Sequence, residues 1–525
     1  MLAMRKLLAA AMGLAFGAAL LSQSRVLGGE SPTRHARVEV DLAAPRATID
    51  PRYLSVAVDA AQVVGATFWS PEAGVEAPGG THPVPPYDFG RPRLRRLAGE
   101  LAPAYLRIGG TTADKIFYDM SAAPVPAPPP HYSAVLTRPQ WDGVNEFAMA
   151  LDYRVVFTLN AGPGPRDVHD AWRPDNAQTL LEYTHEKKYP VALWDFGNEA
   201  SAYPFTIRFG YRISAGQLAS DVAVVRKLVD QAAPGALLAA PSSAYWPVVG
   251  ELLPLYGDFM AKGAGALIDV VTWHYYPQQS RRCLLATRRA SPDRMLDPVA
   301  LDEVDTWAAR VESARDRYAQ GKPVWLGESG NAQCGGEPGV SDAFVSGFWW
   351  LDQLGRVARR GEPVLVRQTL SGSNYGLIDD DTLDPRPDYW TSVLWRRMMG
   401  DRVLDATAGR DPRLRVYAHC TRHGAPDAAP GAVTLAVVNL DPSRGVSLEL
   451  GAYGDIADVY ELSSPDLTSP VIDLNGARLI ASSDGSLPAL APAVVSRDAA
   501  GLRASFEPAT YGFVVLPHAE APACR

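Results

Sequence analysis

The sequence predicts an α/β fold in which a (β/α)8 barrel, the TIM-barrel architecture, is followed by a β-sandwich. Up to about residue 400, eight short apolar runs alternate with longer amphipathic segments. The runs are almost continuously apolar, as are strands of a parallel sheet that is covered on both faces. After about residue 400 the pattern changes to short alternating segments between Pro, Gly and Asp turns, which is typical of a sandwich.

The eight predicted barrel strands are spread over the first three quarters of the chain. They begin at Tyr53, Tyr105, Arg154, Ala192, Ala236, Val270, Pro323 and Pro363. Helices are expected between them, among others from Gln217, Ala300 and Ser341, where apolar residues recur with helical spacing. An open, doubly wound sheet is the alternative, but eight strand–helix units favour the closed barrel.

The sandwich is expected to combine the two ends of the chain. Residues 51–400 are assigned to the catalytic barrel and residues 401–525 to the sandwich. Residues 36–50 are expected to supply an N-terminal strand to the sandwich, because ARVEVDL from Ala36 has the same alternation. Further sandwich strands are predicted at RLRVYAHC, AVTLAVVNL, VSLEL, DVYEL, ARLIAS and YGFVVLP.

Residues 1–29 have the features of a secretory signal peptide. Arg5 and Lys6 precede an apolar run over residues 7–21, and small and polar residues follow. The run is short for a membrane span, although a retained signal anchor is the alternative. We therefore expect a secreted or periplasmic protein that has no membrane association once the signal is removed. We also expect the protein to be a monomer.

Composition narrows the classes of partner. The chain of 525 residues has 50 Lys and Arg against 58 Asp and Glu, a formal charge of −8, and no long basic run, which argues against nucleic-acid binding. Four cysteines in an oxidising compartment allow up to two disulfides. They lack the C-x-x-C spacing and paired histidines of a structural zinc site, and we predict neither a metal nor a cofactor.

Two glutamates stand where predicted strands end. Glu199 follows strand four and Glu328 ends strand seven, so in an eight-stranded ring the two side chains would face each other across the mouth. Glycoside hydrolysis needs such a pair, with one carboxylic acid to protonate the leaving oxygen and one carboxylate to attack the anomeric carbon. Asn198 precedes the first glutamate and can bind a sugar hydroxyl beside the reacting carbon.

The alternatives to a glycoside hydrolase site are a purely structural role for each glutamate and two other functions. A single glutamate at a strand end is usually a loop or capping residue, and the case depends on the pair. A serine hydrolase would need Gly where Asn331 stands in the segment GESGN from Gly327. A catalytically dead carbohydrate-binding protein would be expected to lack one of the two carboxylates, and both are present.

The chain resembles the heparanase family, glycoside hydrolase family 79, from about residue 36 to its C-terminus. The resemblance implies a retaining β-glucuronidase with a (β/α)8 barrel and a β-sandwich. The matching segments are YLSVAVDA from Tyr53, LAPAYLRIGGTTAD from Leu101, WDFGNEASAYPF from Trp194, VTWHYY from Val271, KPVWLGESGNAQCGG from Lys322, SDAFVSGFWWLDQLGRVARRG from Ser341, NYGLIDDDTLDPRPDYW from Asn374 and LRVYAHCT from Leu414.

The resemblance also implies roles for individual residues. It makes Glu199 the acid/base and Glu328 the nucleophile, whose charge should raise the pKa of Glu199 and keep it protonated. It makes Tyr276 the tyrosine that hydrogen-bonds the nucleophile, with Tyr275 as the alternative. His274 alternates onto the same face as Tyr276 and is expected at the site. Asp59 and Thr111, at the ends of strands one and two, resemble residues that hold sugar hydroxyls.

A glucuronidase must bind a carboxylate. In the family this is done by a Gly-rich loop after the nucleophile together with a Gln and a Tyr after strand eight, which correspond here to Gly335, Gln368 and Tyr375. The chain departs from the family at Cys334, where relatives often have Gly. Cys334 either pairs with Cys283 or remains a free thiol, while the resemblance implies a Cys420–Cys524 disulfide.

Endo-acting members of the family bind sulfated chains, so the substrate is expected to be a heparan sulfate-like polysaccharide and the cleft to have a basic rim. The residues assigned to this basic rim are Lys187 and Lys188 before strand four and Arg281, Arg282, Arg288 and Arg289 after strand six. An ordinary solvated face is the other interpretation of these charges. The sequence leaves open whether the enzyme is endo-acting or removes terminal glucuronic acid from other glycans or glycosides.

Overall fold

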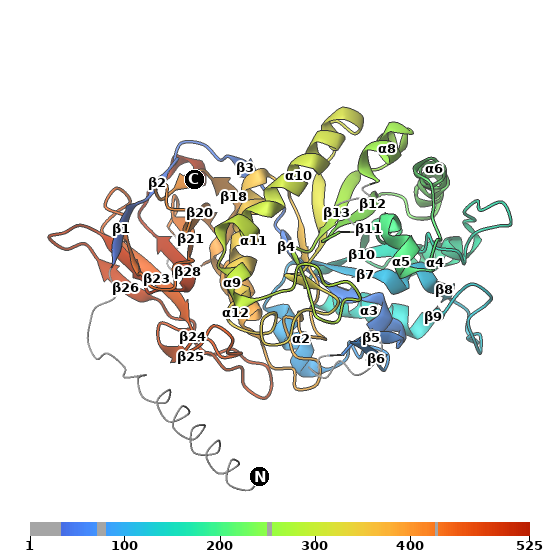
Figure 1. Ribbon diagram of the computed structural model, residues 1–525, viewed down its shortest axis with the longest axis horizontal. Helices are drawn as coiled ribbons and strands as arrows, with labels where there is room; N and C mark the ends of the chain where they lie inside the picture. Colours follow the sequence, from blue (N-terminus) through green and yellow to red (C-terminus); the bar gives the residue numbers. More distant parts are fainter. Residues whose placement is uncertain (1–32, 71–79, 249–254, 426–428) are drawn as a thin grey trace, which may run out of the picture.

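The computed structural model describes residues 33–70, 80–248, 255–425 and 429–525, so the expected signal peptide lies outside the described residues. Eight parallel strands close into a barrel, which confirms the predicted fold class, and a strand-rich region lies beside it (Figure 1). The barrel strands in chain order are β4 Leu54–Asp59, β7 Ala104–Gly109, β10 Tyr153–Leu159, β11 Val191–Phe196, β12 Leu237–Tyr245, β13 Val270–Tyr275, β15 Val324–Ser329 and β17 Leu365–Arg367.

Helices cover the outside of the barrel. The longer ones are α2 Pro92–Gly99, α3 Arg138–Ala150, α4 Asp175–Lys187, α6 Ala215–Ala232, α10 Pro298–Tyr318, α11 Ser346–Arg360 and α12 Pro387–Met398. Two of these helices begin with a side-chain cap. The Ser214 side chain accepts a hydrogen bond from the amide of Gln217 in α6, and the Asp297 side chain accepts one from the amide of Val299 in α10. No helix within the described ranges combines the length and the apolar character that a membrane crossing needs.

Helix α11 begins five residues later than the sequence pattern predicts. The amide of Phe344 donates to Ser469 O and the amide of Val345 donates to Leu467 O, each at 2.8 Å. These amides are therefore used to attach the segment before the helix to the sandwich. In Figure 1, α11 lies between the barrel and the sandwich sheets, and Tyr53 of the barrel donates to Leu354 O of this helix at 2.7 Å.

The sandwich consists mainly of two sheets. A nine-stranded sheet is built on β18 Met399–Leu404, β20 Leu414–Thr421, β21 Val433–Asn439, β23 Ile456–Ser463 and β28 Thr510–Leu516. A three-stranded sheet contains β1 Arg34–Arg37, β22 Val446–Glu449 and β27 Arg503–Phe506. The N-terminal segment thus joins the sandwich as predicted. It does so as short pieces, because β2 Glu39–Val40 pairs with β19 Ala406–Thr407 and β3 Ala47–Thr48 pairs with β18.

One predicted sandwich strand is largely wrong. In ARLIAS only β25 Ala477–Arg478 is a strand, and the apolar residues Leu479 and Ala481 instead pack into the main hydrophobic core from an irregular segment. The disulfide Cys420–Cys524 fastens the C-terminus to β20.

Candidate active site

The two predicted glutamates lie at the carboxyl ends of two barrel strands that are three places apart in the ring, and both line one cavity of about 430 Å³. Glu199 follows β11 and adopts a left-handed backbone conformation, with φ of 56°. Its amide donates to Ser242 O at 3.0 Å, which fixes this turn against β12. Glu328 belongs to β15, where it pairs in register with His274 of β13.

The carboxylates and His274 form a compact cluster. One side-chain oxygen of each glutamate and one ring nitrogen of His274 all lie within 4.8 Å of one another. The ring Nδ1 is 3.0 Å from Glu199 Oε1 and 3.8 Å from Glu328 Oε2. A metal could be ligated by such a set, but the guanidinium of Arg107 already supplies a positive charge 2.6 Å from Glu328 Oε2.

Both oxygens of Glu328 accept strong hydrogen bonds. Arg107 Nη1 donates to Oε2 at 2.6 Å and the Tyr276 hydroxyl donates to Oε1 at 2.7 Å. Burial alone would raise the pKa of Glu328, but the charges of His274 and Arg107 and the hydrogen bond from Tyr276 outweigh it and hold this pKa below its usual value. Glu328 is therefore ionised near neutral pH.

Glu199 has the opposite electrostatic setting. Burial raises the pKa of its carboxyl, the contact with His274 opposes this rise, and the negative charge of Glu328 adds to it. The net direction is upward, which favours the protonated form. Two neighbouring carboxyls whose pKa values are pushed apart are the arrangement that assigns one as acid and the other as nucleophile.

Arg107 was not identified from the sequence, although it interrupts the apolar run of strand two. It is almost completely buried, and besides Glu328 it donates to Asn198 Oδ1 at 2.9 Å. A Cβ atom on Gly109 would lie 2.5 Å from the guanidinium carbon, so glycine is needed to leave room for this side chain. An arginine inside an otherwise apolar barrel strand is itself a signal, because a buried cation needs a carboxylate partner.

The predicted tyrosine contact is made by Tyr276, while Tyr275 is buried in the core next to Trp273. Asn198 also has its backbone fixed, since its amide donates to Asp114 Oδ2 at 2.8 Å. Asp114 was not identified from the sequence. It lies directly after the glycine-rich end of strand two, in the segment that contains Thr111, which lines the cavity.

The wall opposite Glu199 carries the residues expected to bind the sugar and its carboxylate. Gln368 Nε2 donates to Asp59 Oδ2 at 3.1 Å and lies 3.5 Å from the Tyr375 hydroxyl. Gln368 Oε1 is buried without a hydrogen-bond partner. Burial raises the pKa of Asp59 to about 7. Gly335 adjoins this wall, since its carbonyl accepts from the amide of Tyr375 at 3.2 Å.

The loop after the nucleophile is closed by a Cys283–Cys334 disulfide, so the free-thiol alternative does not apply. Cys334 has φ of 61°, a conformation that glycine adopts without steric cost. The disulfide joins the segment after strand six to the segment after strand seven, at the edge of the cavity.

The structure does not assemble the expected basic rim. Lys188 lies at the amino ends of the strands, in a pocket with Arg154 and Pro190, and Lys187 is its neighbour at the end of α4. That is the end of the barrel opposite the glutamates, because both lysines precede strand four. The prediction for these two residues was wrong.

None of the four arginines of the expected rim lines the cavity, and three of them bind acidic or carbonyl groups. Arg282 is buried and donates to Gly336 O at 2.5 Å. Arg281 pairs with Glu337, and Arg288 pairs with Glu303 at 3.0 Å. Arg289 is exposed and does not line the cavity.

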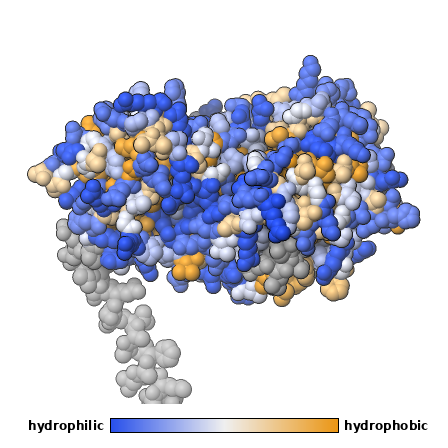
Figure 2. Space-filling view, turned by 90° about the horizontal axis from the view of Figure 1, so that it is seen from above, coloured by the Kyte–Doolittle hydropathy of each residue, from blue (hydrophilic) through white to orange (hydrophobic). Residues whose placement is uncertain are grey.

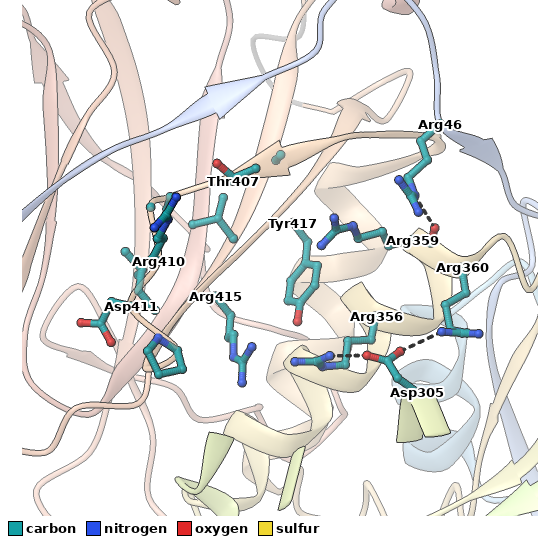
Figure 3. A pocket seen from close by; sticks show the side chains of 16 residues that line it. Arg46, Asp305, Arg356, Arg359, Arg360, Thr407, Arg410, Asp411, Arg415 and Tyr417 are labelled. Atoms are coloured by element: carbon teal, nitrogen blue, oxygen red, sulfur yellow. Dashed lines mark hydrogen bonds and ion pairs between the residues drawn. The ribbon is translucent and has the colours of Figure 1, made fainter. Parts of the chain in front are cut away.

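A second pocket, between α11 and the sandwich, is rich in arginine (Figure 3). Its guanidinium groups are largely paired with carboxylates. The pairs include Arg356–Asp305 at 2.5 Å, Arg360–Asp305 at 3.2 Å, Arg46–Asp405 at 3.0 Å and Arg415–Asp302 at 2.9 Å. This pocket is a charge-balanced contact between the two parts of the fold. The molecular surface seen in Figure 2 is mostly hydrophilic, with smaller apolar areas.

Comparisons with known proteins give matches along most of the chain. Residues 84–355 match the model of the glycosyl hydrolase family 79 N-terminal domain. Heparanase from Gallus gallus is 30% identical to the chain, and the match covers 94% of the chain and 97% of that relative. Inactive heparanase-2 from Homo sapiens is 31% identical, and the match covers 74% of the chain and 66% of that relative. A solved structure, the 4-O-alpha-L-rhamnosyl-beta-D-glucuronidase from Fusarium oxysporum, superposes with a TM-score of 0.62 at 15% identity, over 92% of the chain and 100% of that structure.

Proposed function

Since the chain belongs to glycosyl hydrolase family 79 and is therefore a glycoside hydrolase, we propose that it is a retaining β-glucuronidase. The observation that carries this proposal is the separation of the two carboxylates. Oxygens of Glu199 and Glu328 lie within 4.8 Å of each other. Retaining glycosidases keep their carboxyl groups about 5 to 5.5 Å apart, whereas inverting enzymes leave about 6.5 to 9.5 Å for a water molecule between them.

The reaction proceeds in two displacements. In the first, a carboxylate oxygen of Glu328 forms a bond to the anomeric carbon as the glycosidic carbon–oxygen bond breaks, and Glu199 gives its proton to the departing oxygen. In the second, Glu199 takes a proton from water, the water oxygen attacks the anomeric carbon, and the ester bond to Glu328 breaks. Arg107 and Tyr276 hold the nucleophile in place through both steps.

Specificity for a glucuronide is assigned to Gln368, Tyr375 and the loop at Gly335. The Tyr375 hydroxyl is a neutral donor, because burial raises its pKa well above the usual value. The Gln368 amide, 3.5 Å away, adds a second neutral donor group. A uronic acid carboxylate would be held there by charge-assisted hydrogen bonds from neutral donors.

Retention is tested by proton NMR of an aryl β-glucuronide during hydrolysis. We expect β-glucuronic acid as the first product, with the α anomer appearing later by mutarotation. Appearance of the α anomer first would contradict the proposal, since it would require a single inverting displacement. Failure to hydrolyse any β-glucuronide would contradict the specificity rather than the family.

The pH profile should depend on Arg107. Activity needs an ionised Glu328, so the rate falls as the pH drops through the lowered pKa of this residue. Activity also needs a protonated Glu199, so the rate falls as the pH rises through the raised pKa of that residue. In Arg107→Gln the acidic limb of kcat/KM is expected to move to higher pH, because the charge that lowers the pKa of Glu328 is gone. Arg226→Gln, at a remote ion pair with Asp269, is the control. An unmoved acidic limb would contradict this role.

Two substrate classes are candidates. The name of the relative from Gallus gallus supports endo action on a heparan sulfate-like polysaccharide. Exo action on glucuronides without sulfates is favoured by the cavity lining, which contains no Lys or Arg among the described residues. Chromatography of digests separates them, because endo action on heparan sulfate yields oligosaccharides of intermediate size and exo action yields free glucuronic acid.

A further inference from the structure

The mouth of the active-site cavity is apolar on the side where the leaving group departs. Four side chains there are strongly exposed: Phe205 at 59%, Phe209 at 94%, Leu284 at 99% and Leu285 at 63%. They account for four of the ten strongly exposed large apolar side chains found in the described residues. Isolated exposed apolar residues are ordinary, but a group of them at the edge of one cavity marks a binding surface. We call these four residues the apolar mouth.

The order of strands in the barrel places the phenylalanines of the apolar mouth opposite the sugar-binding wall and its leucines between the two. Asp59, Gln368 and Tyr375 come from the ends of strands one and eight, which are neighbours in the ring. Phe205 and Phe209 follow Glu199 after strand four, and Leu284 follows strand six. The group released by protonation from Glu199 therefore leaves toward the apolar mouth.

The position of the leucine pair is fixed by covalent structure. Leu284 and Leu285 directly follow Cys283, which is joined to Cys334 beside the nucleophile loop. The carbonyl of Leu285 also accepts from Gln279 Nε2 at 2.9 Å. Trp246 and Val248, which follow strand five, line the same cavity.

Charges around the cavity argue against a sulfated group at this position. The lining includes the carboxyls of Asp59, Glu199 and Glu328 and, among the described residues, no Lys or Arg. Of the arginines near the leucine pair in sequence, Arg281 and Arg282 bind Glu337 and the Gly336 carbonyl, and Arg288 pairs with Glu303. Arg289 is exposed but does not belong to the cavity lining. A sulfate placed against the apolar mouth would lose water without gaining a cation from the lining.

We propose that the apolar mouth is the leaving-group subsite and that it selects β-glucuronides whose aglycone is uncharged and apolar, an aromatic or alkyl group. This inference rests on the proposed β-glucuronidase function and specifies its substrate class. The apolar aglycone covers Phe205, Phe209, Leu284 and Leu285 when the sugar occupies the inner wall, and this buried area contributes binding that a sulfated sugar cannot provide.

The test uses 4-alkylphenyl β-glucuronides, whose phenols differ little in acidity while the alkyl group grows from methyl to butyl. For the unmodified protein, kcat/KM is expected to rise about tenfold along the series, because each added methylene is partly buried. The double variant Phe209→Ser, Leu284→Ser should flatten this rise, because the loss in kcat/KM is expected to be larger for butylphenyl glucuronide than for phenyl glucuronide. Val494→Ser, at an exposed apolar residue of the sandwich far from the cavity lining, is the control.

The outcomes separate this inference from the proposed function. The apolar subsite would be overturned if every member of the series had the same kcat/KM. It would also be overturned if the double variant lost the same factor in kcat/KM for phenyl and butylphenyl glucuronide. Neither result would contradict the proposed glucuronidase function. Faster cleavage of a sulfated glucuronide-containing oligosaccharide than of butylphenyl glucuronide would also overturn the apolar subsite. No hydrolysis of any glucuronide would contradict the proposed function itself.

Discussion

Replacement of the nucleophile, Glu328→Gln, is expected to reduce turnover of every glucuronide by about 10⁴-fold or more. The amide that replaces the carboxylate cannot form the covalent bond to the anomeric carbon, and nearby residues cannot take over this step. The measurement is kcat/KM with an aryl β-glucuronide, with circular dichroism to establish that the variant is folded.

Glu362→Gln is the matched control for this substitution. Glu362 is another buried acid, but it lies at the opposite end of the barrel, where it accepts from Trp273 Nε1 at 2.9 Å. Burial raises its pKa to about 8, so it is mostly protonated at neutral pH and an amide is a close substitute. The control should keep its activity. More than a few per cent activity in the Glu328 variant would show that another group is the nucleophile.

Replacement of the acid/base, Glu199→Gln, is expected to have an effect that depends on the leaving group. Poor leaving groups need the proton from Glu199, and their hydrolysis should fall by about 10²- to 10⁴-fold. Good leaving groups depart unaided, so a glycosyl-enzyme should form and accumulate. Added azide should then restore turnover and yield a glucuronyl azide, because azide attacks without needing a base. Absence of rescue in folded protein would argue against this role for Glu199.

The fold and the reacting pair could be predicted because both depend on local pattern and chain order. Eight apolar runs identified the strands, and the rule that barrel sites lie at the carboxyl ends of strands pointed to Glu199 and Glu328. The same rule, applied to Lys187 and Lys188, would have excluded them, since they precede a strand. Arg107 was missed although its place inside an apolar run is a readable signal.

Other features could not be read from the sequence because they depend on tertiary contacts. Arg281 and Arg282 look like free charges in the chain, and only the fold brings Glu337 and the Gly336 carbonyl to them. The high exposure of Phe209 and Leu284 is equally unpredictable, since apolar residues in a sequence normally indicate the core. The substrate class inferred for the cavity therefore rests on the structure.

The central claim, a covalent intermediate on Glu328, is tested most directly by trapping it. A 2-deoxy-2-fluoro-β-glucuronide with a good leaving group slows the second displacement more than the first, so the covalent adduct accumulates. The modified enzyme can then be digested and its peptides analysed by mass spectrometry. We predict one glucuronyl adduct, on Glu328 in the segment WLGESG. An adduct on Glu199, or inactivation without any covalent adduct, would contradict it.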